Sequence, residues 1–154
     1  MLAPYWLVTT QQPNGIWKVP AEGGTAVQLT SVGTYPQESS DGERVFYIAG
    51  GNEMELWSVS VNGGDEHREE GMPNLVNNIS WIPYQDGIYF IDGPPAHFTI
   101  KYFNFSDRKT VPVIQIPRVS FLCCGIAVTH NKDTLLFSGL DQVKSDIMLA
   151  ENFR

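Results

Sequence analysis

The sequence is short of basic residues and of long apolar runs. Ten Lys and Arg stand against 17 Asp and Glu, so the net charge is −7 and the phosphate backbone of a nucleic acid would be repelled. No apolar run approaches the roughly 18 residues that a membrane helix requires, and no basic stretch precedes an apolar one at the start of the chain. We therefore expect no nucleic-acid partner, no membrane insertion and no signal peptide in this chain.

Cysteine is equally scarce, since it occurs only at the neighbouring positions Cys123 and Cys124. Adjacent residues of a strand point to opposite faces, so these two are badly placed to form a disulfide with each other. On an inner strand, free cysteine behaves as a small hydrophobic residue. The cysteines therefore leave the cellular compartment open.

Short apolar and aromatic blocks, separated by turn residues, make up most of the chain. Hydrophobic residues account for 42% of it and charged residues for only 18%, which favours a globular domain over a disordered chain. The 14 Gly and 10 Pro between the blocks are typical of many short strands joined by tight turns, and no long helical periodicity is present. The predicted fold class is all-β.

The chain repeats itself. Gly15–Val19, followed by a Gly-Gly pair, matches Glu55–Val59, also followed by Gly-Gly, at a spacing of 40 residues, and weaker copies lie at 100–105 and 146–150. A strand that ends in an aromatic residue precedes each copy by 9 or 10 residues; these four aromatic residues are Trp6, Tyr47, Phe90 and Phe137. About 40–45 residues for each four-stranded unit is the spacing of β-propeller blades.

The repeats place one domain over residues 1–154, with units at about 4–30, 33–71, 75–116 and 120–151. The two central units each contain four predicted strands, and each terminal unit contains three. This amounts to about three and a half blades of four antiparallel strands, which is fewer than most closed propellers contain. The sequence therefore predicts a partial β-propeller.

A turn motif adds a family resemblance. The segment 39–47, Ser-Ser-Asp-Gly-Glu-Arg-Val-Phe-Tyr, resembles the Ser-Pro-Asp-Gly-Lys-x-Ile-x-Phe repeat of TolB-like, WD-repeat-like β-propellers, and Leu56–Val59 resembles the strand that follows it. Ser40 replaces the proline of the motif, and residues 130–132 depart from it in the last copy. The segment 145–154 resembles the final strand of the propeller in bacterial proteins that carry a winged-helix regulator in front. The resemblance implies the C-terminal half of such a propeller, a binding role and a periplasmic setting.

Catalytic signatures are absent from the sequence. It contains no Gly-x-Ser-x-Gly, no His-Glu-x-x-His and no phosphate-binding Gly-x-x-x-x-Gly-Lys. His67 lies among carboxylates, but on an outer strand where Arg68 competes for them, and His130 occupies a turn; both are interpreted as solvent-facing residues. We expect no catalytic residue, no metal site and no cofactor.

The candidate ligand-binding residues are Asn74, His97 and Arg118. His97 lies in the loop between the second and third strands of its unit, and Asn74 and Arg118 lie in connections between units, as Val32–Thr34 does. In a propeller these loops share one rim, and binding residues concentrate on loops that a rigid scaffold holds. The sequence therefore predicts a protein or peptide partner at this rim. Two alternatives stay open: the accessory propeller of a serine peptidase, and a gene fragment without independent activity.

The strand count also predicts self-association. Fourteen predicted strands leave an open arc whose terminal faces carry Trp6 and Trp17 at one end and Leu136, Phe137 and Ile147 at the other. Two chains would supply 28 strands, enough for seven four-stranded blades. A homodimer that closes a seven-bladed ring would cover both faces, whereas unpaired edges would otherwise promote aggregation.

Overall fold

The computed structural model describes residues 5–11, 14–51, 53–75, 80–94, 97–116, 121–129 and 134–140. All regular elements within these ranges are strands, so the all-β prediction is confirmed. Since the described ranges include no helix, they offer no candidate for a membrane-spanning helix.

The strands form four separate antiparallel sheets that follow one another along the chain. The first sheet contains β1 (Tyr5–Gln11), β2 (Asn14–Pro20) and β3 (Val27–Gln28), and the second contains β4 (Thr34–Glu38), β5 (Arg44–Ala49), β6 (Glu55–Ser60) and β7 (His67–Arg68). The third contains β8 (Trp81–Tyr84), β9 (Gly87–Asp92), β10 (Thr99–Asn104) and β11 (Lys109–Gln115), and the fourth contains β12 (Phe121–Val128) and β13 (Leu135–Leu140).

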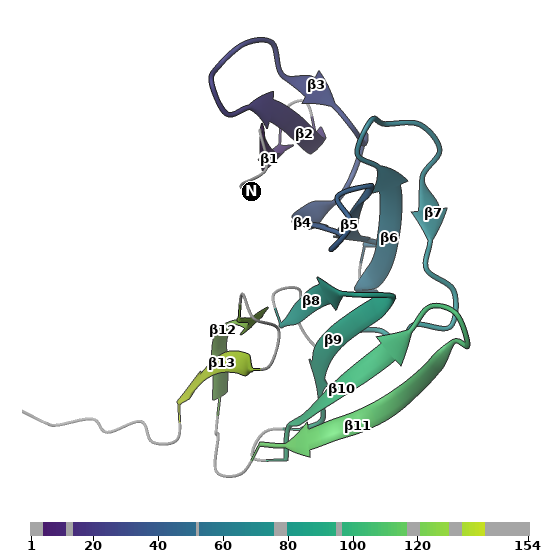
Figure 1. The fold of residues 1–154 in the computed structure, drawn as a ribbon, viewed down its shortest axis with the longest axis vertical. Coiled ribbons are helices and arrows are strands. Elements are labelled where there is room, and N and C mark those ends of the chain that lie inside the picture. The colour runs from purple at the N-terminus through teal and green to yellow at the C-terminus, as the bar shows by residue number, and fades with distance from the viewer. Residues whose placement is uncertain are drawn as a thin grey trace, which may run out of the picture.

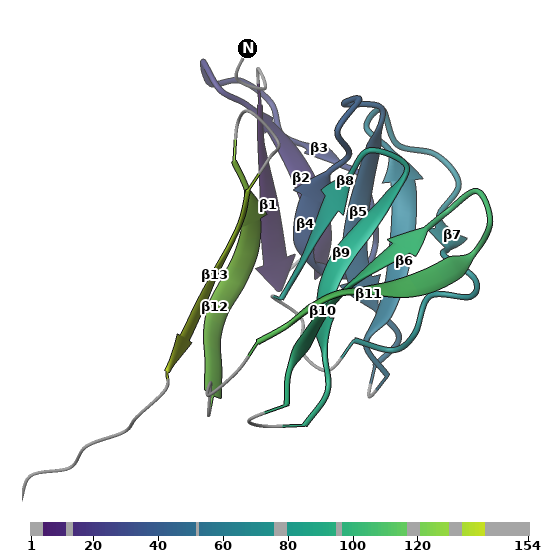
Figure 2. The ribbon, with the colours of Figure 1, turned by 60° about the horizontal axis from the view of Figure 1, so that its bottom comes forward.

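The four sheets are arranged as an open arc (Figures 1 and 2). Consecutive sheets pack face to face, and β1, β4 and β8 lie on the inner side of the arc while β3, β7 and β11 lie on its periphery. Antiparallel sheets placed radially in this way are the blades of a β-propeller. The predicted partial propeller is therefore the observed architecture.

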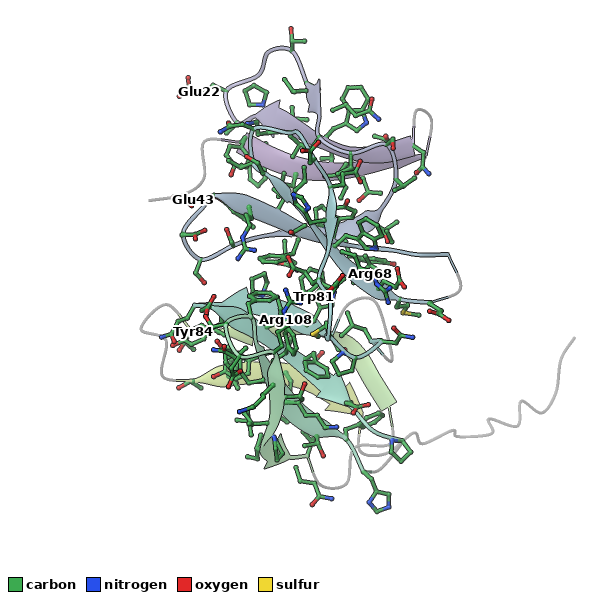
Figure 3. The ribbon with its side chains drawn as sticks, turned by 90° about the vertical axis from the view of Figure 1, so that its right-hand side faces the viewer. Glu22, Glu43, Arg68, Trp81, Tyr84 and Arg108 are labelled. Carbon is green, nitrogen blue, oxygen red and sulfur yellow. The ribbon has the colours of Figure 1, made fainter. Side chains whose placement is uncertain are left out.

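Packing between sheets explains why the central strands are apolar on both sides. In β5, four successive residues are buried, because Val45 and Tyr47 pack toward the first sheet while Phe46 and Ile48 pack toward the third. Trp81, 1% exposed, lies between the second and third sheets (Figure 3). Each hydrophobic cluster therefore joins two neighbouring sheets.

The four repeated aromatic residues lie within their strands rather than at the strand ends that the sequence predicts, and they are buried only where a sheet lies on both sides. Tyr47 and Phe90 are 0% and 1% exposed, as the prediction of packing between blades requires. Trp6 and Phe137, on the first and last sheets, are 66% and 42% exposed. Phe137 is the direct cross-strand neighbour of Ile126, which packs on the third sheet, so it lies on that inward side rather than on the outer face predicted for it. Ile147 lies outside the described residues.

Candidate binding rim

The loops that the sequence assigns to one rim do meet at one end of the sheets. Ser80, at the end of the connection from the second to the third sheet, accepts a hydrogen bond from the Ile91 amide near the end of β9. Near the start of the same connection, the amide of Leu75 donates to the carbonyl of Met54, which directly precedes β6. The two described ends of this connection therefore lie beside the β5–β6 and β9–β10 turns. We call this end of the sheets the rim.

The structure places two of the three candidate ligand-binding residues at the rim. Asn74 directly precedes the buried Leu75 and is exposed, and His97 is exposed in the β9–β10 turn, where its amide donates to the Pro94 carbonyl at 3.0 Å. Arg118 lies outside the described residues, as does His130. The binding role of all three candidates stays a prediction.

A cleft of about 430 Å³ opens at the rim between the first and second sheets. The predicted connection Val32–Thr34 forms part of its wall, together with the first residue of β2 and the turn that follows β5. Its lining residues are Asn14, Val32, Gly33, Thr34, Ile48, Ala49, Gly50, Gly51 and Met54.

Two polar side chains hold this wall in place. The hydroxyl of Thr30, which is 2% exposed, accepts from the Ile16 amide at 3.0 Å and donates to the Val32 carbonyl at 2.5 Å. The side-chain amide of Gln28 donates to the carbonyls of Asn14 and Thr30, both at 3.0 Å. A buried hydroxyl that satisfies two backbone groups fixes the connection against the first sheet. The cleft wall is therefore supported from beneath by hydrogen bonds.

Glycine is required where this connection passes over the second sheet. Gly33 has a φ of 105°, and a Cβ there would lie 2.4 Å from the ring of Tyr47. A side chain at this position would therefore both strain the backbone and displace a buried aromatic ring. Glycine therefore allows this part of the cleft wall to lie directly against Tyr47.

None of the described residues that line the cleft carries a charge. Its apolar groups include Val32, 46% exposed, and the half-buried Met54, and its polar groups come from Asn14, Thr34 and the backbone at Gly50 and Gly51. A small apolar group flanked by hydrogen-bonding amides, such as an apolar side chain on a peptide backbone, has matching chemistry.

A second hollow of about 400 Å³ lies between β1 and β4 and shares Thr34 with the cleft; Leu7, Thr9, Tyr35 and Pro36 also line it. Tyr35 is 43% exposed and has a φ of 54°, beside a register shift between Thr34 and Gln37 in the β4–β5 pairing. Sequence reasoning missed this residue, because a tyrosine next to proline carries no signal for left-handed backbone. The inner side of the arc therefore presents an exposed aromatic ring close to the rim.

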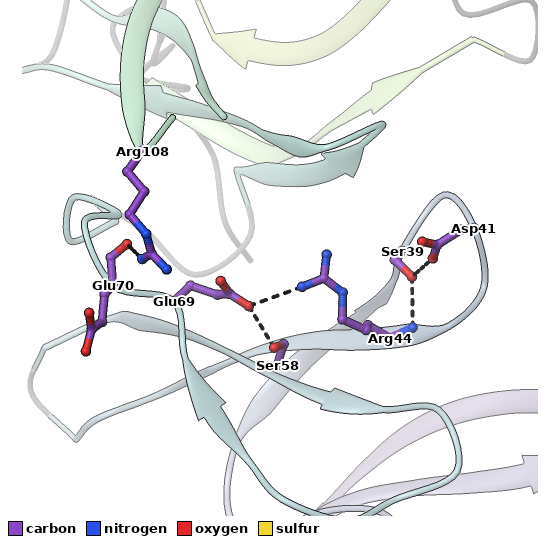
Figure 4. A network of polar contacts seen from close by, with 7 residues as sticks. All are labelled: Ser39, Asp41, Arg44, Ser58, Glu69, Glu70 and Arg108. Carbon is purple, nitrogen blue, oxygen red and sulfur yellow. Dashed lines mark hydrogen bonds and ion pairs between the residues drawn. The ribbon is translucent and has the colours of Figure 1, made fainter. Parts of the chain in front are cut away.

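Several charged groups near His67 have structural partners. Glu69 accepts from the Ser58 hydroxyl at 2.7 Å and lies 3.6 Å from the guanidinium of Arg44 (Figure 4). Arg68 pairs with Glu55 at 2.8 Å. Among the described residues, no three His, Cys, Asp or Glu side chains gather as metal ligands would.

The motif that carries the family resemblance has a structural role at the opposite end of the second sheet. The Ser39 hydroxyl accepts from the Arg44 amide at 2.9 Å and donates to the Asp41 carboxylate at 2.5 Å (Figure 4). The Ser39 hydroxyl and the Glu43 amide, both donating to Asp41, hold the pKa of that carboxyl below its usual range. Arg44 continues from this turn over the rings of Phe46 and Phe105, at 4.8 and 5.4 Å from their centroids. The motif thus joins the second sheet to the third.

Comparison with known proteins identifies the architecture. The sequence matches no protein-family model and no curated protein. Thirteen chains of solved structures match, among them the following two. TolB from Acinetobacter baumannii is 12% identical with a TM-score of 0.65, and a protein assigned as TolB from Agrobacterium tumefaciens is 15% identical with a TM-score of 0.51.

The chain has a TolB-like β-propeller fold. The match covers 88% of the chain for the Acinetobacter structure and 73% for the Agrobacterium structure. The chain spans only 35% of the length of the Acinetobacter protein and 45% of the length of the Agrobacterium protein. At these identities the comparison shows the fold alone, which agrees with a partial propeller.

Proposed function

We propose that this TolB-like chain is a non-catalytic module that binds a protein or peptide at the rim. The observation that carries the proposal is the uncharged cleft between the first and second sheets, which is walled by Val32–Thr34 and held by buried hydrogen bonds. A preformed concave surface lowers the entropic cost of binding, and an apolar anchor can fill it. An apolar side chain of the partner would enter the cleft while its backbone meets Asn14 and Thr34.

Asn74 and His97 extend the proposed surface along the same rim to the third sheet. Both side chains are exposed and both lie in loops whose bases are fixed by backbone hydrogen bonds. Loops on a rigid scaffold can present polar groups without a large ordering cost. A partner that extends beyond the cleft would meet these two side chains, and Arg118 is the third proposed contact.

Capture from an extract of the source cells, followed by affinity measurement with the captured partner, tests the proposal. Val32→Asp places a charge in the cleft and should weaken binding about tenfold or more, equivalent to roughly 1.4 kcal/mol. Val27→Asp is the matched control, because Val27 is 50% exposed on β3 against 46% for Val32. Equal affinity of the two variants would contradict the cleft assignment, and absence of any captured partner would contradict the binding role.

A second pair of variants tests the rest of the rim. Asn74→Ala with His97→Ala removes the two described rim side chains. Asn62→Ala with His67→Ala removes exposed residues of the same types away from the rim. Only the first pair should weaken binding. If both pairs bind as tightly as the parent, Asn74 and His97 are not part of the surface.

The predicted homodimer is a separate part of the proposal, since it would use other surfaces than the rim. The support for it is the exposure of large apolar side chains on the two terminal sheets, where Trp6 is 66% and Leu136 is 55% exposed. Contiguous apolar patches of this kind commonly mark association sites.

A further inference from the structure

We infer that the outward face of the first sheet packs against the outward face of the fourth sheet of a second copy of this chain. The inference rests on the proposed homodimer and names its surfaces. It would place the two copies head to tail, with each copy contributing one face of each kind.

The first of these surfaces is apolar and uncharged. Cross-strand pairing places Trp6 opposite Val19 and Val8 opposite Trp17, so these four side chains share one face of the sheet. Their neighbours Leu7 and Ile16 belong to the opposite face, which packs on the second sheet. We call the face with Trp6, Val8, Trp17 and Val19 the first end face.

The first end face also has an unsatisfied donor. The indole N–H of Trp17 is buried, and it has no hydrogen-bond partner among the described residues. A buried polar group without a partner is costly, and native structures usually pair such groups. Because this N–H is already covered within the chain, it is a local cost of the fold and does not determine which molecule packs on the face.

The second surface is hollow where the first one protrudes. Ala127 and Leu136 are direct cross-strand neighbours on the side of the fourth sheet that faces away from the third, and both are exposed. A depression of about 320 Å³ lies on this sheet, lined by Gly125, Ile126, Ala127, Leu136, Phe137 and Ser138. None of these side chains is charged. We call the exposed side with Ala127 and Leu136 the fourth end face.

The molecule itself shows what kind of surface covers such faces. Between the second and third sheets, aromatic and branched side chains at the same repeat positions interdigitate, and Phe90 there is 1% exposed. A protruding Trp6 and a depression lined partly by glycine, alanine and serine are complementary in the same way. With a net charge of −7, two copies of the chain repel each other overall, and uncharged faces add no local repulsion to that. A second copy is therefore the occupant that both faces fit.

The sheet order changes the size of the predicted ring. Among the described residues the terminal sheets are separate, each with its own pairing, so that each chain contributes four described sheets and two chains contribute eight. When a two-fold axis through the centre of a ring exchanges the two copies, the ring must contain an even number of blades. The structure therefore favours a closed dimer of eight sheets over the seven blades obtained by counting strands.

Light scattering coupled to size-exclusion chromatography tests the inference. At micromolar concentration, the parent should elute at about twice the 17.2 kDa of one chain. Trp6→Glu and Leu136→Glu each place a charge on one end face and should each give a monomer. Ile114→Glu is the matched control, since Ile114 on β11 is 56% exposed against 55% for Leu136, and it should remain a dimer. Circular dichroism of all three variants checks that they fold.

Mixing the two end-face variants gives a further test of the head-to-tail arrangement. The Trp6→Glu chain retains an intact fourth end face and the Leu136→Glu chain an intact first end face, so an equimolar mixture should recover a dimer through one contact. A dimer that survives Leu136→Glu but not Trp6→Glu would mean that the first face pairs with itself, which overturns the arrangement. A dimer that survives both substitutions overturns the face assignment and leaves the homodimer standing.

The remaining outcomes are equally decisive. A monomeric parent overturns the homodimer together with this inference. Long polymers that both end-face substitutions abolish would support the contact and overturn its two-fold closure. Polymers that neither substitution affects would overturn the contact itself.

Discussion

At the scale of single residues, the same amino acid serves different purposes in repeats that look alike. Asp41-Gly42 and Asp86-Gly87 occupy equivalent places in the sequence, and both predict a turn. In the structure, Tyr84 pairs directly with Gly87, so the two turn residues are Gln85 and Asp86 and the turn is tighter, as predicted. Gly87 itself begins β9, and a Cβ on it would lie 2.2 Å from the Phe103 carbonyl oxygen. The glycine at this repeat position is therefore required by the close approach of two backbone segments rather than by the geometry of the turn.

Burial of repeated aromatic residues is predictable only in part for a similar reason. The spacing correctly predicts that Tyr47 and Phe90 pack between sheets. It cannot show that Trp6 is exposed, because exposure depends on whether a neighbouring sheet is present and not on the residue. At the rim, the position of the connection Val32–Thr34 between two units correctly predicts that it lies at the candidate site, where it lines the cleft. No sequence motif predicts that Gln28 and Thr30 hold this connection by hydrogen bonds.

Tyr47 gives the clearest prediction at this scale. Its hydroxyl donates to Glu66 at 2.5 Å, and burial together with this carboxylate raises the pKa of the phenol. Tyr47→Phe should lower the free energy of unfolding at pH 7 by roughly 1.5–3 kcal/mol, the usual range for a hydrogen bond to a charged group. Urea unfolding measures this loss. Tyr35→Phe, at an exposed tyrosine, should change stability far less.

The same pair predicts a dependence on alkaline pH. The folded chain keeps the Tyr47 proton above pH 10, where a tyrosine of the unfolded chain loses it, so rising pH favours unfolding. The stabilisation is complete below about pH 10 and should decline above it by at most about 1.4 kcal/mol per pH unit. Tyr47→Phe should therefore show a shallower decline between pH 10 and 12. Parallel curves for parent and variant would show that Tyr47 does not titrate differently in the two states.

At the scale of elements, the outer strands differ more than the repeat suggests. β3 and β7 have two residues each, whereas β11 in the same position has seven, and Val111, Val113 and Ile114 on it are 46–56% exposed. A long apolar edge is a template for pairing with other chains. The sequence shows the apolar run but not that it lies on an edge, since an edge is defined by the missing neighbour.

Proline limits the risk at this edge. Phe105 donates to Asp86, so alternate residues of β10 bond toward β9, and Lys101 is one of them. Pro112 is the partner of Lys101 in β11, so its backbone nitrogen faces the free edge. Because proline has no N–H, an added strand would find no hydrogen-bond donor at this position. The register shift between Ile100 and Lys101 further interrupts the edge.

Restoring that donor should make the edge competent for pairing. Pro112→Thr adds an N–H and a β-forming residue to β11, and we expect faster, concentration-dependent aggregation, followed by turbidity or light scattering. Pro73→Thr is the control, because Pro73 is exposed but lies in no strand. Aggregation at the parent's rate in Pro112→Thr would show that this proline does not protect the edge.

At the scale of the whole molecule, stability is distributed as in a linear array. Each hydrophobic cluster joins two successive sheets: the one with Ile16 and Tyr47 joins the first and second, the one with Phe46 and Trp81 the second and third, and the one with Ile91 and Ile126 the third and fourth. In such arrays, stability is approximately the sum of unit stabilities and nearest-neighbour contacts. The central sheets therefore have two stabilising contacts and the terminal sheets one.

Hydrogen exchange should reveal this difference directly. At low protein concentration, amides of β1, β2, β12 and β13 should exchange through openings at least about tenfold more populated than those of β5, β6, β9 and β10, because one fewer sheet contact must break. Mass spectrometry of peptic fragments resolves these strands. Uniform protection over all four sheets would mean that the arc unfolds as one unit, against the additive description.

If the end faces associate as inferred, raising the protein concentration should slow exchange in the terminal sheets first and leave the central sheets nearly unchanged, since only the terminal sheets gain a neighbour. Trp6→Glu should remove that concentration dependence while leaving the central protection intact, which separates the stability of the arc from the contact between its copies.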